Sequence, residues 1–173
     1  SKITGFITVL FFATTDPIYA AANRPQPRTT VACVPPYLGK GYARAYSYKC
    51  KLATGTYPNN TPCLPVTHGG KQLDQAGLCQ EDKCKPFTKL NPLLKVCVFP
   101  ESLHKCPDIE NTKKIVLDFC HYYCKGADKE WYFGYYKNEG NSLCHLENPD
   151  TPKEFGQCCK GKCVKKGQCT ANY

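Results

Sequence analysis

Cysteine constrains this sequence more than any other residue type, because it supplies 14 of the 173 residues. Such a proportion is typical of exported proteins that depend on disulfide bonds and is rare in cytosolic enzymes, whose thiols stay reduced. The even number allows every cysteine to pair. We therefore expect a secreted, extracellular, disulfide-rich protein that is mostly β, with short strands and long loops.

The spacing of the cysteines repeats along the chain and predicts two tandem related modules. Gly77-Leu78-Cys79, four residues and Cys84 correspond to Gly156-Gln157-Cys158, four residues and Cys163. The full correspondence sets Cys33, Cys50, Cys63, Cys79, Cys84 and Cys97 against Cys106, Cys124, Cys144, Cys158, Cys163 and Cys169, which leaves Cys120 and Cys159 unmatched. We expect three disulfides in module 1, residues 33–99, four in module 2, residues 100–173, and none between them.

The repeat suggests a pairing for every cysteine. The expected bridges are Cys33–Cys50, Cys63–Cys84 and Cys79–Cys97 in the first module, with Cys106–Cys124, Cys144–Cys163, Cys120–Cys159 and Cys158–Cys169 in the second. One alternative stays open, in which the adjacent pair exchange roles and Cys120 bonds to Cys158. Modules of about 70 residues bury little apolar area, so the bridges must supply part of the stability.

The first residues have the plan of a secretory signal peptide. Lys2 precedes an apolar run over residues 5–13, and small residues lead to a cleavage site after Ala22 or, alternatively, Ala20. The run is too short for a membrane-spanning helix. We expect residues 1–22 to be removed and the remainder not to span a membrane. Residues 23–32 follow as a basic, proline-containing arm that is extended or disordered.

Positive charge is concentrated in the first module. Residues 23–99 contain eleven lysines and arginines against three acids, whereas residues 100–173 contain eleven lysines against ten acids. Such a field attracts anionic proteins, sulfated glycans or anionic lipid surfaces, although it can also serve solubility alone. Lys160, Lys162, Lys165 and Lys166 could add to this attraction or form a solvated end. Nucleic acid is not an expected partner, because no recognition module is present.

Aromatic residues gather on two predicted strands of the second module. Residues 114–123 and 131–136 are rich in β-branched and aromatic residues, with a turn at residues 138–141, and residues 42–48 with a turn at 57–60 are a weaker copy. Alternation along the strands would expose about half of the aromatic side chains as interface anchors. The candidate partner-binding residues are Tyr122, Tyr123, Trp131, Tyr132, Tyr135 and Tyr136. The alternative is that they cover the disulfide core.

No motif in the sequence indicates catalysis or metal binding. Cys120-His121 and Cys144-His145 contain zinc-ligating residue types, but no C-x-x-C pair accompanies them, and an oxidising compartment consumes thiolates. The H-E-x-x-H and G-x-S-x-G motifs and the phosphate-binding glycine loop are absent. His68, His104, His121 and His145 are expected at the surface. We therefore expect a monomer that is not an enzyme and has no metal or cofactor.

One N-glycosylation motif is present, Asn59-Asn60-Thr61, and it makes Asn59 the candidate modification site. Pro62 follows the motif directly. We expect this proline to lower the occupancy of the site.

One set of residues resembles a known family. The set comprises Phe119-Cys120-His121-Tyr122-Tyr123-Cys124, Trp131, Gly134-Tyr135-Tyr136, Asn138, Cys144 and the segment from Gly156 to Cys163. This pattern resembles the tick salivary cysteine-rich proteins of the basic-tail group and, more distantly, the class A evasins. The likeness covers the second module well and the first loosely. The long lysine tail of the group is reduced here to Lys165 and Lys166.

The resemblance implies a non-enzymatic inhibitor of a host plasma or extracellular protein. Relatives in this group block complement, coagulation or chemokines, and the two-module chain is similar to tick complement inhibitors that act on the alternative pathway through properdin. Complement inhibition is therefore the leading expectation. A basic first module would repel basic chemokines and also properdin, whereas coagulation factors or anionic surfaces suit its charge. An anticoagulant and an evasin-like chemokine binder are the alternatives.

Overall fold

Short β-strands supply most of the regular structure of residues 31–37, 40–138 and 142–169, which are the residues that the computed structural model describes. All fourteen cysteines are joined in seven disulfides. The expectation of a disulfide-rich, mostly β fold is confirmed. The expected signal peptide and residues 23–30 of the expected arm lie outside the described residues. Within those residues, no helix has the length and apolar character needed to cross a membrane.

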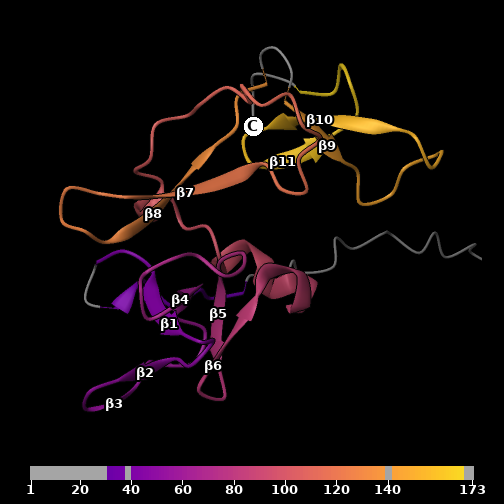
Figure 1. The fold of residues 1–173 in the computed structure, drawn as a ribbon. Coiled ribbons are helices and arrows are strands. Elements are labelled where there is room, and N and C mark those ends of the chain that lie inside the picture. The colour runs from indigo at the N-terminus through magenta and orange to yellow at the C-terminus, as the bar shows by residue number, and fades with distance from the viewer. Residues whose placement is uncertain (1–30, 38–39, 139–141, 170–173) are drawn as a thin grey trace, which may run out of the picture. The chain divides into compact units, whose positions relative to one another are not determined.

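The first half of the chain forms a four-stranded sheet and a small hairpin (Figure 1). The sheet has the order β1 (Ala43–Tyr46), β4 (Pro62–Val66), β5 (Gly77–Gln80), β6 (Lys83–Pro86), and the hairpin joins β2 (Lys51–Leu52) to β3 (Gly55–Thr56). Strand β1 runs parallel to β4, and the other neighbours are antiparallel. Alternation along β1 buries Ala43 and Ala45 and turns Arg44 and Tyr46 outward.

Short 3-10 helices follow this sheet and lead to the second half. They are η2 (Phe87–Lys89), η3 (Pro92–Cys97) and η4 (Glu101–Leu103). Pro92 suits the start of η3, where its fixed φ costs nothing, and the Asn91 side chain accepts a hydrogen bond from the Leu93 amide at 3.0 Å. Each helix is too short to present a broad apolar face, so the packing of single residues such as Leu103 holds them in place.

The second half contains a hairpin and a three-stranded sheet (Figure 1). Strands β7 (His121–Lys125) and β8 (Trp131–Tyr135) form the hairpin, and the sheet has the order β11 (Lys162–Val164), β10 (Phe155–Cys159), β9 (Leu143–His145). The strand expected over residues 114–123 is therefore shorter than predicted. Lys114 has a positive φ of 53°, and within 114–120 only Leu117 pairs, in a single parallel bridge to Cys144.

The two sheets share one register around their cysteines. Cys63 lies opposite Gly77 as Cys144 lies opposite Gly156, and Cys79 faces Cys84 as Cys158 faces Cys163. Both glycines are required, because an added Cβ would lie 1.8 Å from the Lys85 carbonyl oxygen at Gly77 and 2.5 Å from the Val164 carbonyl oxygen at Gly156. The Gly-x-Cys pattern of the sequence thus marks the same position in two meanders.

Each of the seven disulfides joins two cysteines of the same half. Three match the expected pairing: Cys63–Cys84, Cys106–Cys124 and Cys144–Cys163. The other four are Cys33–Cys97, Cys50–Cys79, Cys120–Cys158 and Cys159–Cys169. The three-and-four division between the halves is therefore also the one that the structure has.

The expected pairs Cys33–Cys50 and Cys79–Cys97 are wrong. The Cys50 amide donates to the Asp82 carbonyl at 2.8 Å, which holds this cysteine against the β5–β6 turn and within 5.8 Å, Cα to Cα, of Cys79. Cys97 is buried at the end of η3 and reaches Cys33 instead. The spacing of cysteines along the sequence favoured bridges between cysteines that are close in sequence. In the folded chain, the pairing of strands decides which sulfur atoms meet.

The expected pairs Cys120–Cys159 and Cys158–Cys169 are also wrong, and the exchanged alternative is the one that the structure contains. Successive residues of a strand point to opposite faces, so only one member of the adjacent pair on β10 can face Cys120. Cys158 and Cys120 belong to the same buried cluster. Cys159 is therefore left to bond with Cys169.

One hydrophobic core draws on both halves. Its buried members include Tyr42, Leu64 and Leu78 from the first half and Tyr132 and Phe133 from the second. The described residues after residue 30 belong to one compact unit. The halves are thus separate in their disulfides but joined in their packing.

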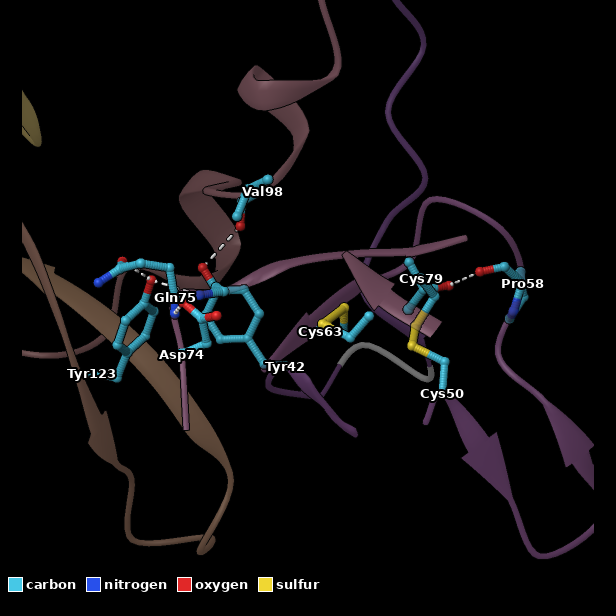
Figure 2. Close-up of a disulfide and its surroundings, with 12 residues drawn as sticks. Tyr42, Cys50, Pro58, Cys63, Asp74, Gln75, Cys79, Val98 and Tyr123 are labelled. Carbon is cyan, nitrogen blue, oxygen red and sulfur yellow. Dashed lines mark hydrogen bonds between the residues drawn. A yellow bond between two sulfur atoms is a disulfide. The ribbon is translucent and has the colours of Figure 1, made fainter. Parts of the chain in front are cut away.

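Hydrogen bonds reinforce this joint core (Figure 2). The Tyr42 hydroxyl donates to the Val98 carbonyl at 2.8 Å, and the Tyr123 hydroxyl donates to Gln75 Oε1 at 2.8 Å. The Tyr123 oxygen also accepts from the Ala76 amide at 2.9 Å. The Tyr123 hydroxyl therefore joins strand β7 to the first half by hydrogen bonds.

Candidate functional site

None of the aromatic side chains expected to form a binding surface is exposed. Tyr132 is 3% exposed, and the other five are half-buried: Tyr122, Tyr123, Trp131, Tyr135 and Tyr136. The expectation that about half would face solvent is wrong, because none of the six side chains is exposed. Tyr123 packs edge-on against Tyr42 of the first half, while Tyr122 packs against Tyr136 at 5.7 Å between ring centroids.

Burial and hydrogen bonding keep the hydroxyls of this hairpin protonated. The pKa of Tyr132 is raised to about 12, first by its hydrogen bond to the Asp128 carboxylate and then by burial. Burial is also the main reason that the pKa of Tyr123 lies well above its ordinary value. These tyrosines therefore act as structural donors and not as acids or bases.

The histidines divide into two exposed and two enclosed residues. His68 and His145 are exposed, as expected, and His68 stacks on the Tyr46 ring at 5.3 Å. His121, in contrast, stacks on Phe99 at 3.6 Å between centroids, and its pKa falls to about 3 because burial, with help from nearby His104, disfavours the charged ring. The expectation of four surface histidines is therefore wrong for His104 and His121.

Sulfur atoms cluster twice in the described residues, but not as metal ligands. One triplet comprises Cys50, Cys63 and Cys84, and the other comprises Cys120, Cys144 and Cys163. Every one of these cysteines is in a disulfide, so no thiolate is offered. The triplets instead mark equivalent pairs of bridges packed together in the two halves.

A cleft of about 1080 Å³ lies beside His104. Its lining residues are Glu101, His104, Asp108, Tyr135, Cys159, Lys160, Lys162, Val164 and Gln168. Both ring nitrogens of His104 face carboxylates: Nε2 is 2.9 Å from Asp108 Oδ1, and Nδ1 is 3.6 Å from Glu101 Oε1. The lining includes no serine, threonine or free thiol that this histidine could activate. The two carboxylates therefore fix the orientation of the His104 ring.

A smaller concavity, of about 330 Å³, is rich in tyrosine and cationic residues. We call it the tyrosine groove and define it by Tyr37, Arg44, Tyr46 and Tyr57 with the flanking Lys40 and Lys51. Strand β1 positions Arg44 and Tyr46 through its alternation. The Tyr37 and Tyr57 rings meet edge to face at 5.3 Å. Tyrosine and arginine are enriched among residues that dominate binding energy at interfaces.

The tyrosine groove is cationic and includes a residue from the second half. Lys40, Arg44 and Lys51 face one acid, Glu130. Arg44 Nη2 lies 3.4 Å from Glu130 Oε1 and donates to the Lys129 carbonyl at 2.8 Å, which fixes the guanidinium. Burial, followed by Glu130, raises the pKa of Tyr57, so its hydroxyl stays a donor. The groove therefore offers hydroxyl and cationic donors to a partner rich in acceptors.

Sequence reasoning missed the tyrosine groove, although a signal was available. Five tyrosines lie between residues 37 and 57, inside the more basic half of the chain. Tyr37 and Tyr46 are each 36% exposed, more than any of the six aromatic residues proposed from sequence. The coincidence of tyrosine and positive charge would have indicated this segment.

Two remaining sequence candidates occupy surface positions. Asn59 is exposed, and its side-chain oxygen accepts from the Glu81 amide at 3.3 Å, while Thr61 of the same motif is buried. Glycosylation of Asn59 stays a prediction. Near the end of the described chain, Lys165 pairs with Asp150 and with Glu154. This lysine is therefore partly neutralised.

Comparison with known proteins finds no matching family model, no matching curated protein and no matching solved structure.

Proposed function

We propose that this chain is a secreted, non-enzymatic protein that binds and inhibits a host defence protein. The proposed target is a component of the alternative complement pathway, and properdin is the candidate that the resemblance suggests. The identity of the target rests on the sequence resemblance to tick salivary inhibitors. The binding role rests on the tyrosine groove, which is the single observation that carries it.

The two halves are proposed to be tandem related modules, each built on the same two-bridge meander. The shared register of Cys63 with Gly77 and of Cys144 with Gly156 supports this relation. In the proposal the first module supplies the groove and the second supplies Glu130, which orders Arg44. A single rigid surface then loses little conformational entropy when it binds.

Lysis of erythrocytes through the alternative pathway tests this function. We expect the purified protein to inhibit lysis at micromolar concentration or below, and the double variant Tyr37→Ala/Tyr46→Ala to lose at least about tenfold in potency. Phe155→Ala is the matched control, because Phe155 is also 36% exposed but lies on β10. Undiminished lysis with wild-type protein, or equal losses in the two variants, would contradict the proposal.

An anticoagulant is the second candidate, and the charge of the first half favours it. Residues 23–99 carry eleven cations against three acids, which suits an anionic coagulation factor or surface. Clotting time measured on the same samples distinguishes the two candidates. Prolonged clotting with normal complement lysis would replace the first proposal, and capture of chemokines in place of both effects would favour the evasin-like alternative.

A further inference from the structure

Two lysines of the first half are held side by side by backbone pairing. Lys49 and Lys83 form an isolated antiparallel bridge. The flanking residues make its hydrogen bonds, from the Cys50 amide to the Asp82 carbonyl and from the Cys84 amide to the Tyr48 carbonyl, each at 2.8 Å. Lys49 and Lys83 are therefore a non-hydrogen-bonded pair of the antiparallel ladder. In such a pair the opposed side chains lie closest to each other. Like charges in this position destabilise a sheet.

The charge continues along both strands from this pair. Lys51, the first residue of β2, follows Lys49 by two residues, and Lys85 follows Lys83 by two on β6. Residues two apart in an extended segment lie about 7 Å apart on the same face. We call these four residues the lysine ladder. Lys49, Lys51 and Lys83 are exposed, and Lys85 is half-buried.

No acidic side chain of the described residues forms an ion pair with the lysine ladder. The ion pairs of the described chain involve other lysines, Arg44 or histidines. Glu81 and Asp82 form the adjacent turn between β5 and β6, but neither carboxylate lies within ion-pair distance of a lysine there. The fold thus holds the opposed lysines together without a direct ion pair to either of them.

The lysine ladder is continuous with the tyrosine groove. Lys51 belongs to both, and beyond it the groove adds Lys40 and Arg44. The first half therefore presents a cationic track that runs from β6 across the Lys49 position to β1. Its length and regular spacing suit an extended chain of anionic groups better than a single small anion.

We propose that the lysine ladder is a binding site for a sulfated glycan, meaning a linear polysaccharide with sulfate groups at regular intervals. Sulfate esters stay ionised and accept several hydrogen bonds, and the lysines that bind them displace the cations condensed along the glycan. A lipid surface is less suited, because the most exposed apolar side chains, Leu93, Val96 and Ile115, belong to η3 and to the loop after Cys106. None of them lies in the ladder.

Binding to heparin, a sulfated glycan, tests the proposal by calorimetry over a range of salt concentrations. The triple variant Lys49→Gln/Lys83→Gln/Lys85→Gln is compared with Lys113→Gln/Lys137→Gln/Lys153→Gln, which removes the same charge from exposed lysines of the second half. We expect the ladder variant to lose at least about tenfold in affinity near physiological salt, and its slope of log affinity against log salt to fall by about 2 to 3. The control should lose less than about twofold.

Four results would overturn the proposal. They are equal losses in the two triple variants, equal affinity for unsulfated hyaluronan, failure of Lys→Arg replacement at the same three positions to keep binding, and tighter lysine-dependent binding to phosphatidylserine vesicles than to heparin. Near-ultraviolet circular dichroism verifies that each variant is folded. The ladder variant retains Tyr37 and Tyr46, so it should still inhibit complement lysis, and failure of one proposal leaves the other testable.

Discussion

His121 occupies the most confined position of any histidine in the described chain. Its ring stacks on Phe99 and meets Tyr135 edge to face, and a Cβ added at Gly161 would lie 2.4 Å from its Nε2 atom. Gly161 itself has a φ of +83° in the turn between β10 and β11. The glycine thus provides both the turn and the space, and the imidazole is kept neutral.

This confinement makes stability depend on pH in a defined direction. The folded pKa of His121 is about 3 against 6.5 for a free histidine, so between these values the unfolded chain binds more protons. The free energy of unfolding should therefore fall as pH drops below 6.5, with His121 contributing up to about 1.4 kcal/mol per pH unit. His104 and Tyr135 are the titratable side chains that lie near the His121 ring.

Urea unfolding of wild type and His121→Gln between about pH 4 and pH 8 measures this contribution. The variant should show a shallower dependence on pH below 6.5, and the two slopes should coincide above it. Equal slopes throughout the range would show that the folded state does not keep this ring neutral.

At the scale of elements, the cysteine pattern predicted which positions of the two halves correspond better than it predicted the bridges. The Gly-x-Cys positions that define the repeat fall on β5 and β10, where Gly77 and Gly156 are required by close backbone contact. The repeat alignment matched Cys50 to Cys124 and so suggested the wrong bridges. In the structure the two sulfur triplets show that Cys50 is equivalent to Cys120. Which strand face a cysteine occupies depends on pairing between distant segments, and spacing does not record it.

Of the two strands expected for the aromatic hairpin, only the second was placed within one residue of its observed range. Strand β8 covers Trp131–Tyr135, close to the predicted range of 131–136. Alternation of side chains along the strands predicts one solvent-exposed face. That prediction is wrong because the first half covers Tyr123. Contact between halves far apart in sequence leaves no periodic signal, so neither this burial nor the tyrosine groove followed from strand patterns.

Tyr123→Phe tests how firmly this hairpin is attached. The change removes a hydroxyl that bonds to Gln75 and Ala76, and it leaves the amide of buried Ala76 and the half-buried Gln75 side chain without this partner. We expect a loss of about 1–3 kcal/mol in the free energy of unfolding, measured with urea. Tyr136→Phe is the control, since its hydroxyl has no hydrogen bond to a described residue. A Tyr123→Phe variant as stable as wild type would argue against the attachment.

At the scale of the whole molecule, the disulfides divide the chain into two halves, whereas the hydrophobic core joins them. Every disulfide closes within one half, which restricts the unfolded chain in two separate parts. The largest core nevertheless takes buried residues from both. The sequence predicted the first property from cysteine counts, but the second depends on long-range packing. The proposed function needs both, because the tyrosine groove uses β1 and Glu130 together.

A single cut between the halves tests this architecture most directly. A protease site inserted between the exposed residues Glu101 and Ser102 allows cleavage of the folded protein. We predict that the two fragments migrate together under native conditions and separate in denaturant without any reductant. Fragments that stay linked in denaturant would reveal a bridge between the halves, and fragments that part under native conditions would contradict the shared core.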